Sequence, residues 1–403
     1  MGESALMYDY LIAGGGRAAV SAAEGIRELD SSGSILIVGS EAHLPYDRPP
    51  LSKQLWAGKK TVDEIFVHDA GYFESENIQL VTSERVKEVR PADKTIVTDR
   101  GRSESYGKLL LATGGTPKRL PITGAGLEGV IYYRTLDHYN ALSRDPAGKS
   151  ILVVGGGFIG SEIAAALNQN KARVTMVFPE RNLCERVFPA PLARSIQSHY
   201  EERGIRVLGR DRLTSIESES GKLVAQTQRG ERLECDTIVV GAGIEPEIEL
   251  ATGAGLSVQN GIEVNERLES TVSGIYAAGD NASFPYQALG RQMRIEHWDN
   301  ALSQGKAAGR NMAGAGEPFT YMPYFFSDLF DFGYEAVGDV NSSLTTFADW
   351  EEENETGVVY YLEEGRVRGV MLCNIWEKLE EARTLIRSGI RVSESDLRGA
   401  IRT

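Results

Sequence analysis

Two segments of the sequence share the same order of an apolar run, a glycine turn and a helix-forming stretch. The first reads YDYLIAGGGRAA at residues 8–19, and the second reads SILVVGGGFIGSE at residues 150–162. A glycine turn between a strand and a helix is typical of dinucleotide-binding modules, because the backbone there turns tightly and approaches a pyrophosphate. The simpler alternative is that both are only tight strand–helix turns.

The predicted nucleotide contacts follow from the positions of the small residues. In the first turn the small residues are Gly14, Gly16 and Ala19. In the second turn they are Gly155, Gly157 and Gly160, with Phe158 and Ile159 between the last two. The first position allows the tight turn, the second lets the backbone approach the pyrophosphate, and the third allows close helix packing. The pyrophosphate is expected at the positive end of the helix dipole.

Each module also has an acid after its second apolar run. Glu41 ends SILIVGSE and Glu180 ends RVTMVFPE. A carboxylate in this position accepts hydrogen bonds from ribose hydroxyl groups and repels a 2′-phosphate. Glu180 therefore favours NADH over NADPH, and the neighbouring Arg181 weakens that preference.

Further glycine-containing segments predict that one module is inserted into the other. TVSGIYAAGDNA at 271–282 contains Gly279 and Asp280 and lies beyond the second module. VVGAGIEP at 239–246, with Gly241 and Gly243, stands where the second module would end. We predict an α/β fold with two Rossmann-like dinucleotide-binding domains, one inserted in the other, and a small C-terminal α/β domain. The predicted boundaries are 1–119 with 246–316 for the outer dinucleotide-binding domain, 120–245 for the inserted one, and 317–403 for the C-terminal domain.

The charge and the cysteines exclude several classes of function. The formal net charge is −14 and no basic run is present, so nucleic acid is an unexpected partner. Cys184, Cys235 and Cys373 lie far apart and form no metal-ligand spacing, so no metal site is expected. Sparse cysteines, with neither a signal peptide nor a long apolar run evident, predict a cytoplasmic protein without membrane association.

Together these motifs resemble the two-dinucleotide-binding flavoproteins of the glutathione-reductase-like superfamily. LPYDRPPLSKQLW at 44–56 resembles the flavin-adjacent loop of ferredoxin reductases, monodehydroascorbate reductases and apoptosis-inducing factor. EHWDNALSQGKAAGRNMAG, PYFFSDLFDFGYEAVGD and GVMLCNIWEKLEEARTLIRSG are similar to apoptosis-inducing factor in particular. The resemblance implies that the outer domain, 1–119 with 246–316, binds FAD and that the inserted domain, 120–245, binds NAD(H). It implies an FAD-dependent enzyme that takes hydride from NADH and has no redox-active disulfide.

The resemblance also assigns roles to individual residues. It implies that Lys53 lies beside the flavin with Glu162 as its ion-pair partner, and that Phe158 lies over the flavin until nicotinamide displaces it. It places Glu296, His297 and Trp298 at a helix start beside the flavin and the nicotinamide. For Phe158 a packing role is equally compatible with the sequence, and for His297 a structural hydrogen bond is the alternative to proton donation. Further implied FAD contacts are Arg48, Val86, Ala112, Thr113, Gly114, Arg134, Gly279 and Asp280.

The sequence departs from the superfamily pattern in two ways that bear on function. No cysteine precedes Cys184, so a redox cysteine pair at the flavin is not expected. Ser40 stands where relatives often have the first ribose acid, with Glu41 one residue later. Two functions stay open. One is electron transfer to a ferredoxin or rubredoxin, a quinone or a small molecule. The other is a slow NADH oxidase whose NADH-induced homodimer acts as a signal.

Overall fold

The computed structural model describes residues 7–401 and divides the chain into two compact units. One unit comprises residues 1–47, 62–116 and 245–323, and the other comprises 48–61, 117–244 and 324–403. Residues 1–6, which begin the predicted FAD domain, and 402–403, which end the C-terminal domain, lie outside the described part. The chain leaves the first unit, builds most of the second and returns, as the nested motifs predict. The division into three domains stays a prediction.

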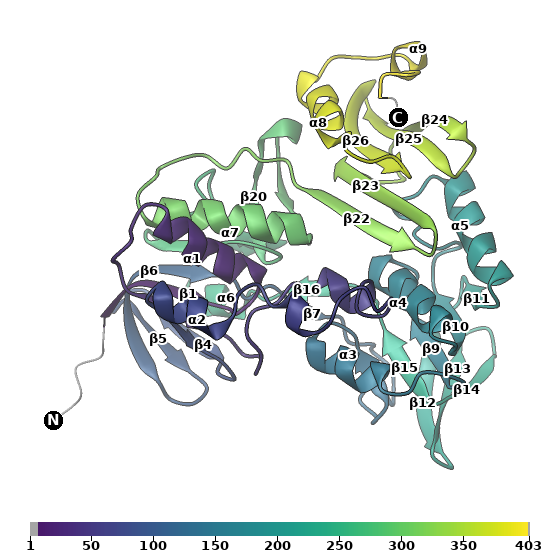
Figure 1. Ribbon diagram of the computed structural model, residues 1–403, viewed down its shortest axis with the longest axis horizontal. Helices are drawn as coiled ribbons and strands as arrows, with labels where there is room; N and C mark the ends of the chain where they lie inside the picture. The colour runs from purple at the N-terminus through teal and green to yellow at the C-terminus, as the bar shows by residue number, and fades with distance from the viewer. Residues whose placement is uncertain (1–6, 402–403) are drawn as a thin grey trace. The chain divides into compact units, whose positions relative to one another are not determined.

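The first unit contains the first glycine turn at the end of a parallel sheet (Figure 1). The parallel strands, in spatial order, are β3 (Ile78–Val81), β2 (Ile35–Val38), β1 (Met7–Ala13), β6 (Ser103–Leu111) and β19 (Ile275–Ala277). The other half of β6 pairs antiparallel with β5 (Thr95–Thr98), which pairs with β4 (Val86–Arg90). A smaller sheet has the order β17 (Val258–Gln259), β18 (Gly261–Glu263), β20 (Ala282–Tyr286), β21 (Arg291–Arg294).

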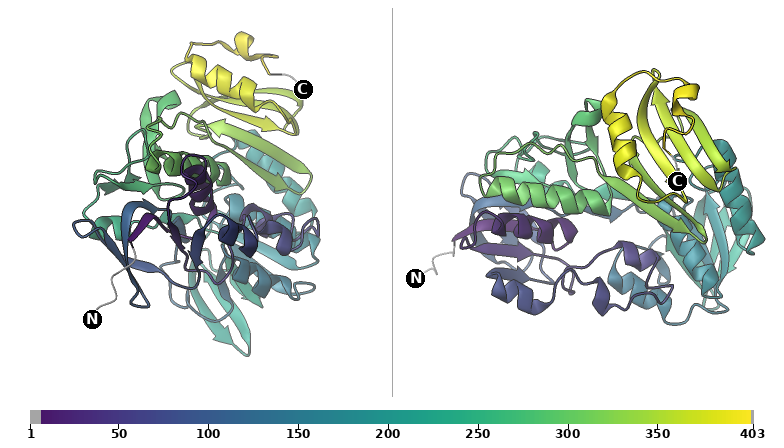
Figure 2. Two further views of the ribbon diagram at one scale, coloured as in Figure 1. Left: turned by 60° about the vertical axis from the view of Figure 1, so that its left-hand side comes forward. Right: turned by 45° about the horizontal axis from the view of Figure 1, so that its top comes forward.

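Helices α1 (Arg17–Arg27) and α7 (Trp298–Met312) lie side by side in this unit (Figures 1 and 2). Glycines allow their backbones to touch. A Cβ atom added to Gly305 would lie 2.3 Å from the carbonyl oxygen of Ala18, and one added to Gly309 would lie 1.9 Å from that of Ala22. No larger residue fits at either position. The short helices α2 (Ala70–Ser75) and α6 (Glu249–Gly253) complete the unit.

The second unit contains the second glycine turn, again at the end of a parallel sheet. Its strands, in spatial order, are β11 (Arg206–Gly209), β10 (Arg173–Phe178), β9 (Ser150–Val154), β15 (Thr237–Val240) and β8 (Val130–Tyr132). The apolar run Ile151–Val154 is buried throughout, as expected of a parallel strand covered on both faces. The helices are α3 (Leu136–Ser143), α4 (Phe158–Gln169) and α5 (Ala190–Glu202), and β12 (Leu213–Glu219), β13 (Lys222–Thr227) and β14 (Arg232–Cys235) form an antiparallel sheet.

The C-terminal part of this unit is an antiparallel sheet with a helix packed on it (Figure 1). The strand order is β22 (Tyr324–Leu329), β23 (Phe332–Gly338), β26 (Arg366–Cys373), β25 (Thr356–Glu363), β24 (Thr345–Glu352). Helix α8 (Leu379–Ser388) contributes buried Ala382 and Ile386, and α9 (Glu394–Leu397) follows it. Strand β22 lies at an edge of the sheet, so one side of its backbone is available to other segments.

The predicted α/β class, with two Rossmann-like modules and a small C-terminal domain, is confirmed. A further two-stranded sheet pairs β7 (Gly115–Pro117) with β16 (Ile244–Pro246). Within residues 7–401, no helix combines the length and the apolar character that crossing a membrane requires.

Candidate functional site

The first glycine turn leaves open space at the start of α1. Gly14 has φ +126°, and a Cβ atom there would lie 2.1 Å from the carbonyl oxygen of Ala112, so this position requires glycine. A Cβ atom on Gly16 would meet nothing within 4 Å. Gly16 is also the N-cap of α1 and makes no side-chain capping bond, so the first N–H groups of the helix face an open, positively polarised space. This cradle fits a pyrophosphate.

The second turn repeats this geometry at the start of α4. Gly155 has φ +122°, and a Cβ atom on it would lie 2.4 Å from the carbonyl oxygen of Gly241. Gly157 is the N-cap and has open space where a Cβ would stand. Gly160 packs so closely that a Cβ would lie 2.1 Å from the carbonyl oxygen of Gly155. Ile159, beside it, is 41% exposed.

The two predicted ribose acids each hold a partner in their own unit. Glu41 accepts a hydrogen bond of 2.5 Å from the hydroxyl of Tyr46, while the neighbouring Ser40 is exposed. Glu180 forms an ion pair of 2.6 Å with Arg186, whose side chain is 83% exposed. The backbone N–H of Arg181 donates to Glu185. Arg186 therefore lies beside the predicted ribose acid, a contact that sequence reasoning missed.

Asp280 and Glu296 are joined in the first unit through Arg294. The guanidinium donates to the backbone carbonyl of Asp280 at 2.9 Å and forms an ion pair of 2.5 Å with Glu296. His297 follows as the N-cap of α7. Its surroundings exclude water and thereby lower the pKa of the imidazole to about 4, although Asp280 acts in the opposite direction. His297 is therefore neutral at pH 7.

Trp298, at the first position of α7, reaches back to the flavin-adjacent loop identified in the sequence. Its indole Nε1 donates to a carboxylate oxygen of Asp47 at 2.5 Å. The loop is also held at Asp47 by a backbone bond to Ile65. Trp298 thus fixes the end of this loop, a positioning contact that the sequence did not reveal.

Lys53 and Glu162 form a buried ion pair in the second unit. The Lys53 ammonium lies 2.7 Å from Glu162 Oε1, and their side chains are 8% and 3% exposed. Ser52 donates to Glu162 Oε2 and Ser327 donates to Glu162 Oε1, each at 2.5 Å. The ammonium also lies 5.2 Å from the centre of the Phe326 ring. Every oxygen of this carboxylate therefore has a donor, which a buried charge requires.

The same unit places two arginines and an aromatic pair around the loop and the second turn. Arg48 donates to the backbone carbonyl of Arg134 at 2.9 Å. Phe158, the first residue of α4, packs on Phe325 with ring centres 5.2 Å apart. This contact is compatible with both predicted roles of Phe158, which are packing and a ring that nicotinamide displaces.

The remaining predicted FAD contacts line the C-terminal edge of the first parallel sheet. Thr113 accepts a bond of 2.9 Å from the amide of Asn281 and donates to the carbonyl oxygen of Glu247. The N–H of Gly279 donates to buried Gln304 on α7 at 2.8 Å. Ala112, Gly114, Gly279 and Asp280 belong to the same edge, and Val86 is buried at the start of β4.

The first unit holds most of the predicted FAD contacts. The second unit holds the predicted NAD contacts together with three predicted FAD contacts, Arg48, Lys53 and Arg134. Gly14, Gly16, Ala19, Ser40, Glu41, Val86, Ala112, Thr113, Gly114, Gly279, Asp280, Glu296, His297 and Trp298 lie in the first. Arg48, Lys53, Arg134, Gly155, Gly157, Phe158, Ile159, Gly160, Glu162, Glu180, Arg181, Gly241 and Gly243 lie in the second.

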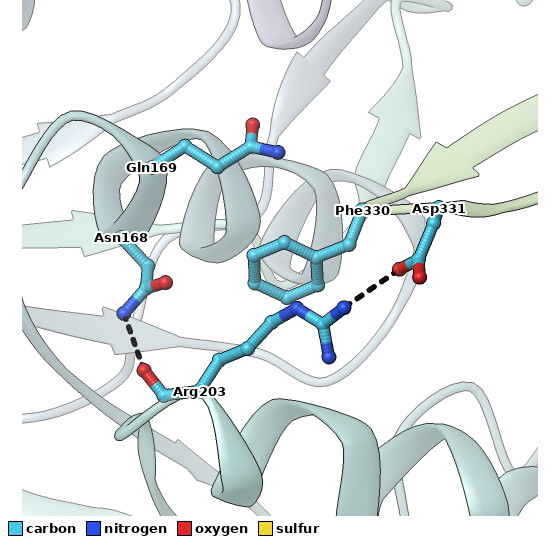
Figure 3. Close-up of a pocket in the computed structure, with 5 residues that line it drawn as sticks. All are labelled: Asn168, Gln169, Arg203, Phe330 and Asp331. Atoms are coloured by element: carbon cyan, nitrogen blue, oxygen red, sulfur yellow. Dashed lines mark hydrogen bonds and ion pairs between the residues drawn. The ribbon is translucent and has the colours of Figure 1, made fainter.

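A shallow pocket of about 430 Å³ lies at the other end of α4 and is lined by Asn168, Gln169, Arg203, Phe330 and Asp331 (Figure 3). Arg203 forms an ion pair with Asp331 and stacks over Phe330 there. A helix rises about 1.5 Å per residue, so Gln169 lies more than a dozen ångströms along α4 from the glycine turn. None of the predicted site residues lines this pocket.

The three thiols do not form a redox pair within the described residues. Cys184, Cys235 and Cys373 are free and buried. Burial raises the pKa of Cys184 and Cys235 to about 12, which leaves both thiols protonated and unreactive at pH 7.

Comparison with known proteins relates these features to a family. A family model described as pyridine nucleotide-disulphide oxidoreductase matches residues 8–305, and one described as apoptosis-inducing factor, mitochondrion-associated, C-term, matches residues 308–356. The chain is 33% identical to apoptosis-inducing factor 1, mitochondrial, from Dictyostelium discoideum, over 94% of this chain and 78% of that protein. It is 32% identical to the ferredoxin–NAD(+) reductase component of an anthranilate 1,2-dioxygenase system from Burkholderia cepacia, over 94% of each chain.

A solved structure is also similar to this chain over nearly its whole length. The structure of the covalent putidaredoxin reductase–putidaredoxin complex has a TM-score of 0.91 and 30% identity, and the match covers 97% of this chain and 95% of that one.

Proposed function

The chain belongs to the pyridine nucleotide-disulphide oxidoreductase family, and from that premise we propose that it passes electrons from NADH to a ferredoxin-type carrier protein. The coarser activity, an FAD-dependent NAD(P)H oxidoreductase, was predicted from the sequence and is confirmed by the family and the relatives. The observation that carries the proposal is the Lys53–Glu162 pair, a buried cation whose counter-ion is held on both oxygens.

The two glycine cradles are proposed to divide the nucleotides between them. The turn of Gly14 and Gly16, with Glu41 and Asp280, would hold FAD, and the turn of Gly155 and Gly157, with Glu180, would hold the nicotinamide nucleotide. When bound, FAD accepts two electrons as hydride and releases them singly to a one-electron carrier.

The chain's own residues supply charge, orientation and exclusion of water. The Lys53 ammonium provides a fixed positive charge that favours an electron-rich ring system, because preorganised charge acts most strongly where water is excluded. The N-terminal end of α7 provides a second positive potential. The lowered pKa of His297 favours a neutral, hydrogen-bonding role for this residue over proton donation.

The preference for NADH follows from Glu180. Its carboxylate repels a 2′-phosphate, which favours NADH. Arg186 is paired with it and is mostly exposed, so the guanidinium is able to turn toward a phosphate and reduce the preference. We therefore expect a preference for NADH with measurable use of NADPH.

The second candidate is a slow NADH oxidase that dimerises on reduction. The observation that favours it is the match of residues 308–356 to the C-terminal model of apoptosis-inducing factor. The net charge of −14 also opposes an acidic carrier, which would need a local basic area on this chain.

An anaerobic titration with NADH, followed by addition of acceptors, tests both candidates. The FAD-loaded protein should lose its flavin absorbance with NADH and recover it rapidly on addition of an oxidised [2Fe–2S] ferredoxin. Lys53→Met should slow the reduction, whereas Lys59→Met, which removes an exposed charge of the same loop, should not. Slow recovery with ferredoxin, menadione and oxygen, together with an NADH-dependent increase in mass by light scattering, would instead support the second candidate.

A further inference from the structure

The carboxylate of Glu162 is held from two directions by hydroxyl groups. Ser52 comes from the short helix η1 (Pro49–Ser52), directly before Lys53. Ser327 comes from β22, at the edge of the C-terminal sheet, 165 residues after Glu162. Lys53 and Ser327 share Oε1, and Ser52 occupies Oε2.

We propose that Ser327 is a positioning residue for the reductive step: by fixing the Glu162 carboxylate, it sets where the Lys53 ammonium lies. The inference rests on the proposed function, in which Lys53 acts beside the flavin. It makes the C-terminal sheet part of the catalytic apparatus, through a residue to which the sequence analysis assigned no role.

The burial of the cluster gives Ser327 this influence. Ser327 is 1% exposed and Glu162 is 3% exposed, so water cannot easily replace a lost hydroxyl. A carboxylate deprived of one donor has more charge unsatisfied and attracts the remaining cation more strongly. The Lys53 ammonium would then be drawn toward Glu162 and would be less able to stabilise negative charge elsewhere.

The neighbouring residue of β22 contacts the lysine itself. Phe326 lies 5.2 Å from the Lys53 ammonium, so Lys53 is enclosed by Glu162 on one side and an aromatic ring on another. Both contacts come from consecutive residues of one edge strand. The strand therefore fixes the lysine directly and through its counter-ion.

The test uses the FAD-loaded protein and measures the rate of flavin reduction by NADH and the flavin midpoint potential. Ser327→Ala should slow reduction about ten-fold or more, because a hydrogen bond to a charged group has that effect on a rate. Its midpoint potential should become more negative. Ser327→Thr, which keeps the hydroxyl, should restore most of the rate. The matched control is Tyr361→Phe, which removes a buried hydroxyl bond of 2.8 Å from the same sheet to the carbonyl of Val187; both readouts should stay at the wild-type value.

A double-mutant cycle distinguishes positioning from general stability. If Ser327 acts through Glu162, adding Ser327→Ala to Glu162→Gln should change the rate by less than about two-fold. An equal loss in both backgrounds, or a Ser327→Ala variant with wild-type rate and potential, overturns the inference. If Ser327→Ala does not fold, Ser52→Ala tests the other oxygen and should shift the potential in the same direction. Failure of the proposed function would appear differently, because NADH would then not reduce the flavin of the wild-type protein. The midpoint potentials, determined by reduction with dithionite, still test the inference in that case.

Discussion

The two glycine modules differ at the third position of the motif. Ala19 is fully buried in the first module, so the packing around α1 has room for a methyl group at this position. In the second module the same position is Gly160, where a methyl group would lie 2.1 Å from the carbonyl oxygen of Gly155. Helix α4 therefore packs more closely on its own turn than α1 does.

The first module makes its closest helix contact elsewhere. Gly305 and Gly309 of α7 bring that helix against the backbone of α1. Whether a motif position tolerates alanine or requires glycine therefore depends on what packs against it, and not on the bound nucleotide alone.

Exchanging the third residues should have unequal effects, and the larger one is expected in the second module. Gly160→Ala must displace backbone, because its new methyl would lie within 2.1 Å of a carbonyl oxygen. A displacement of this kind near a substrate site costs about a hundred-fold in rate, so kcat/KM for NADH should fall by about that factor. Ala19→Gly should cost only about 1 kcal/mol of unfolding free energy. Steady-state kinetics and chemical unfolding measure the two effects. Equal losses in both variants would show that the packing difference has no functional consequence.

Substituting either predicted ribose acid should weaken the binding of one nucleotide and leave the other unaffected. The expected size lies between those of the preceding and the following predictions. Glu41→Gln should weaken FAD binding about ten-fold and leave the KM for NADH unchanged, because one charge-assisted hydrogen bond contributes at this level. Glu180→Gln should raise the KM for NADH about ten-fold, affect NADPH less and leave FAD binding unchanged. Fluorescence titration of FAD and initial rates measure these constants. A rise in the NADH KM for Glu41→Gln would contradict the assignment of the nucleotides.

Lowering the pH should decrease the folding stability of the first unit, and this is the smallest of the expected effects. The pKa of His297 is about 4 in the folded protein and about 6.5 when exposed, so the unfolded chain binds more protons between these values. Stability should therefore fall as the pH decreases from about 6.5 to about 4. The expected loss is about 1 kcal/mol, less than the full shift implies, because the ring is partly exposed and solvent screens its charge. Denaturant unfolding at several pH values, with His297→Gln as the control, measures the difference. An identical pH profile for the variant would exclude His297 as the cause.

The sequence contained enough to predict the family, the fold class and the oxidoreductase activity, because strand–glycine–helix segments are local patterns. Pairing Lys53 with Glu162 required the family resemblance, since nothing local connects residues so far apart. Ser327 could not be found in this way. A serine in an apolar strand has no signature, and its partner is decided by the fold.

Contacts made by loops were predicted least well. The resemblance placed Trp298 at a helix start beside the flavin, and it did not reveal that the indole holds Asp47. Arg186 lies in a segment of ordinary composition, and only the ion pair with Glu180 reveals it. In each case the partner is set by backbone turns, which the alternation of apolar and polar residues does not specify.

The packing of α1 against α7 has a consequence for how the protein is synthesised. Gly305 follows Ala18 by 287 residues, and ribosomes add about 5–20 residues per second, so the apolar face of α1 waits roughly 15–60 seconds for its partner. The intervening domain is translated during that delay and is able to fold first. A nascent chain halted before α7 should therefore carry an exposed helix face that attracts chaperones, while the same chain extended past residue 312 should release them.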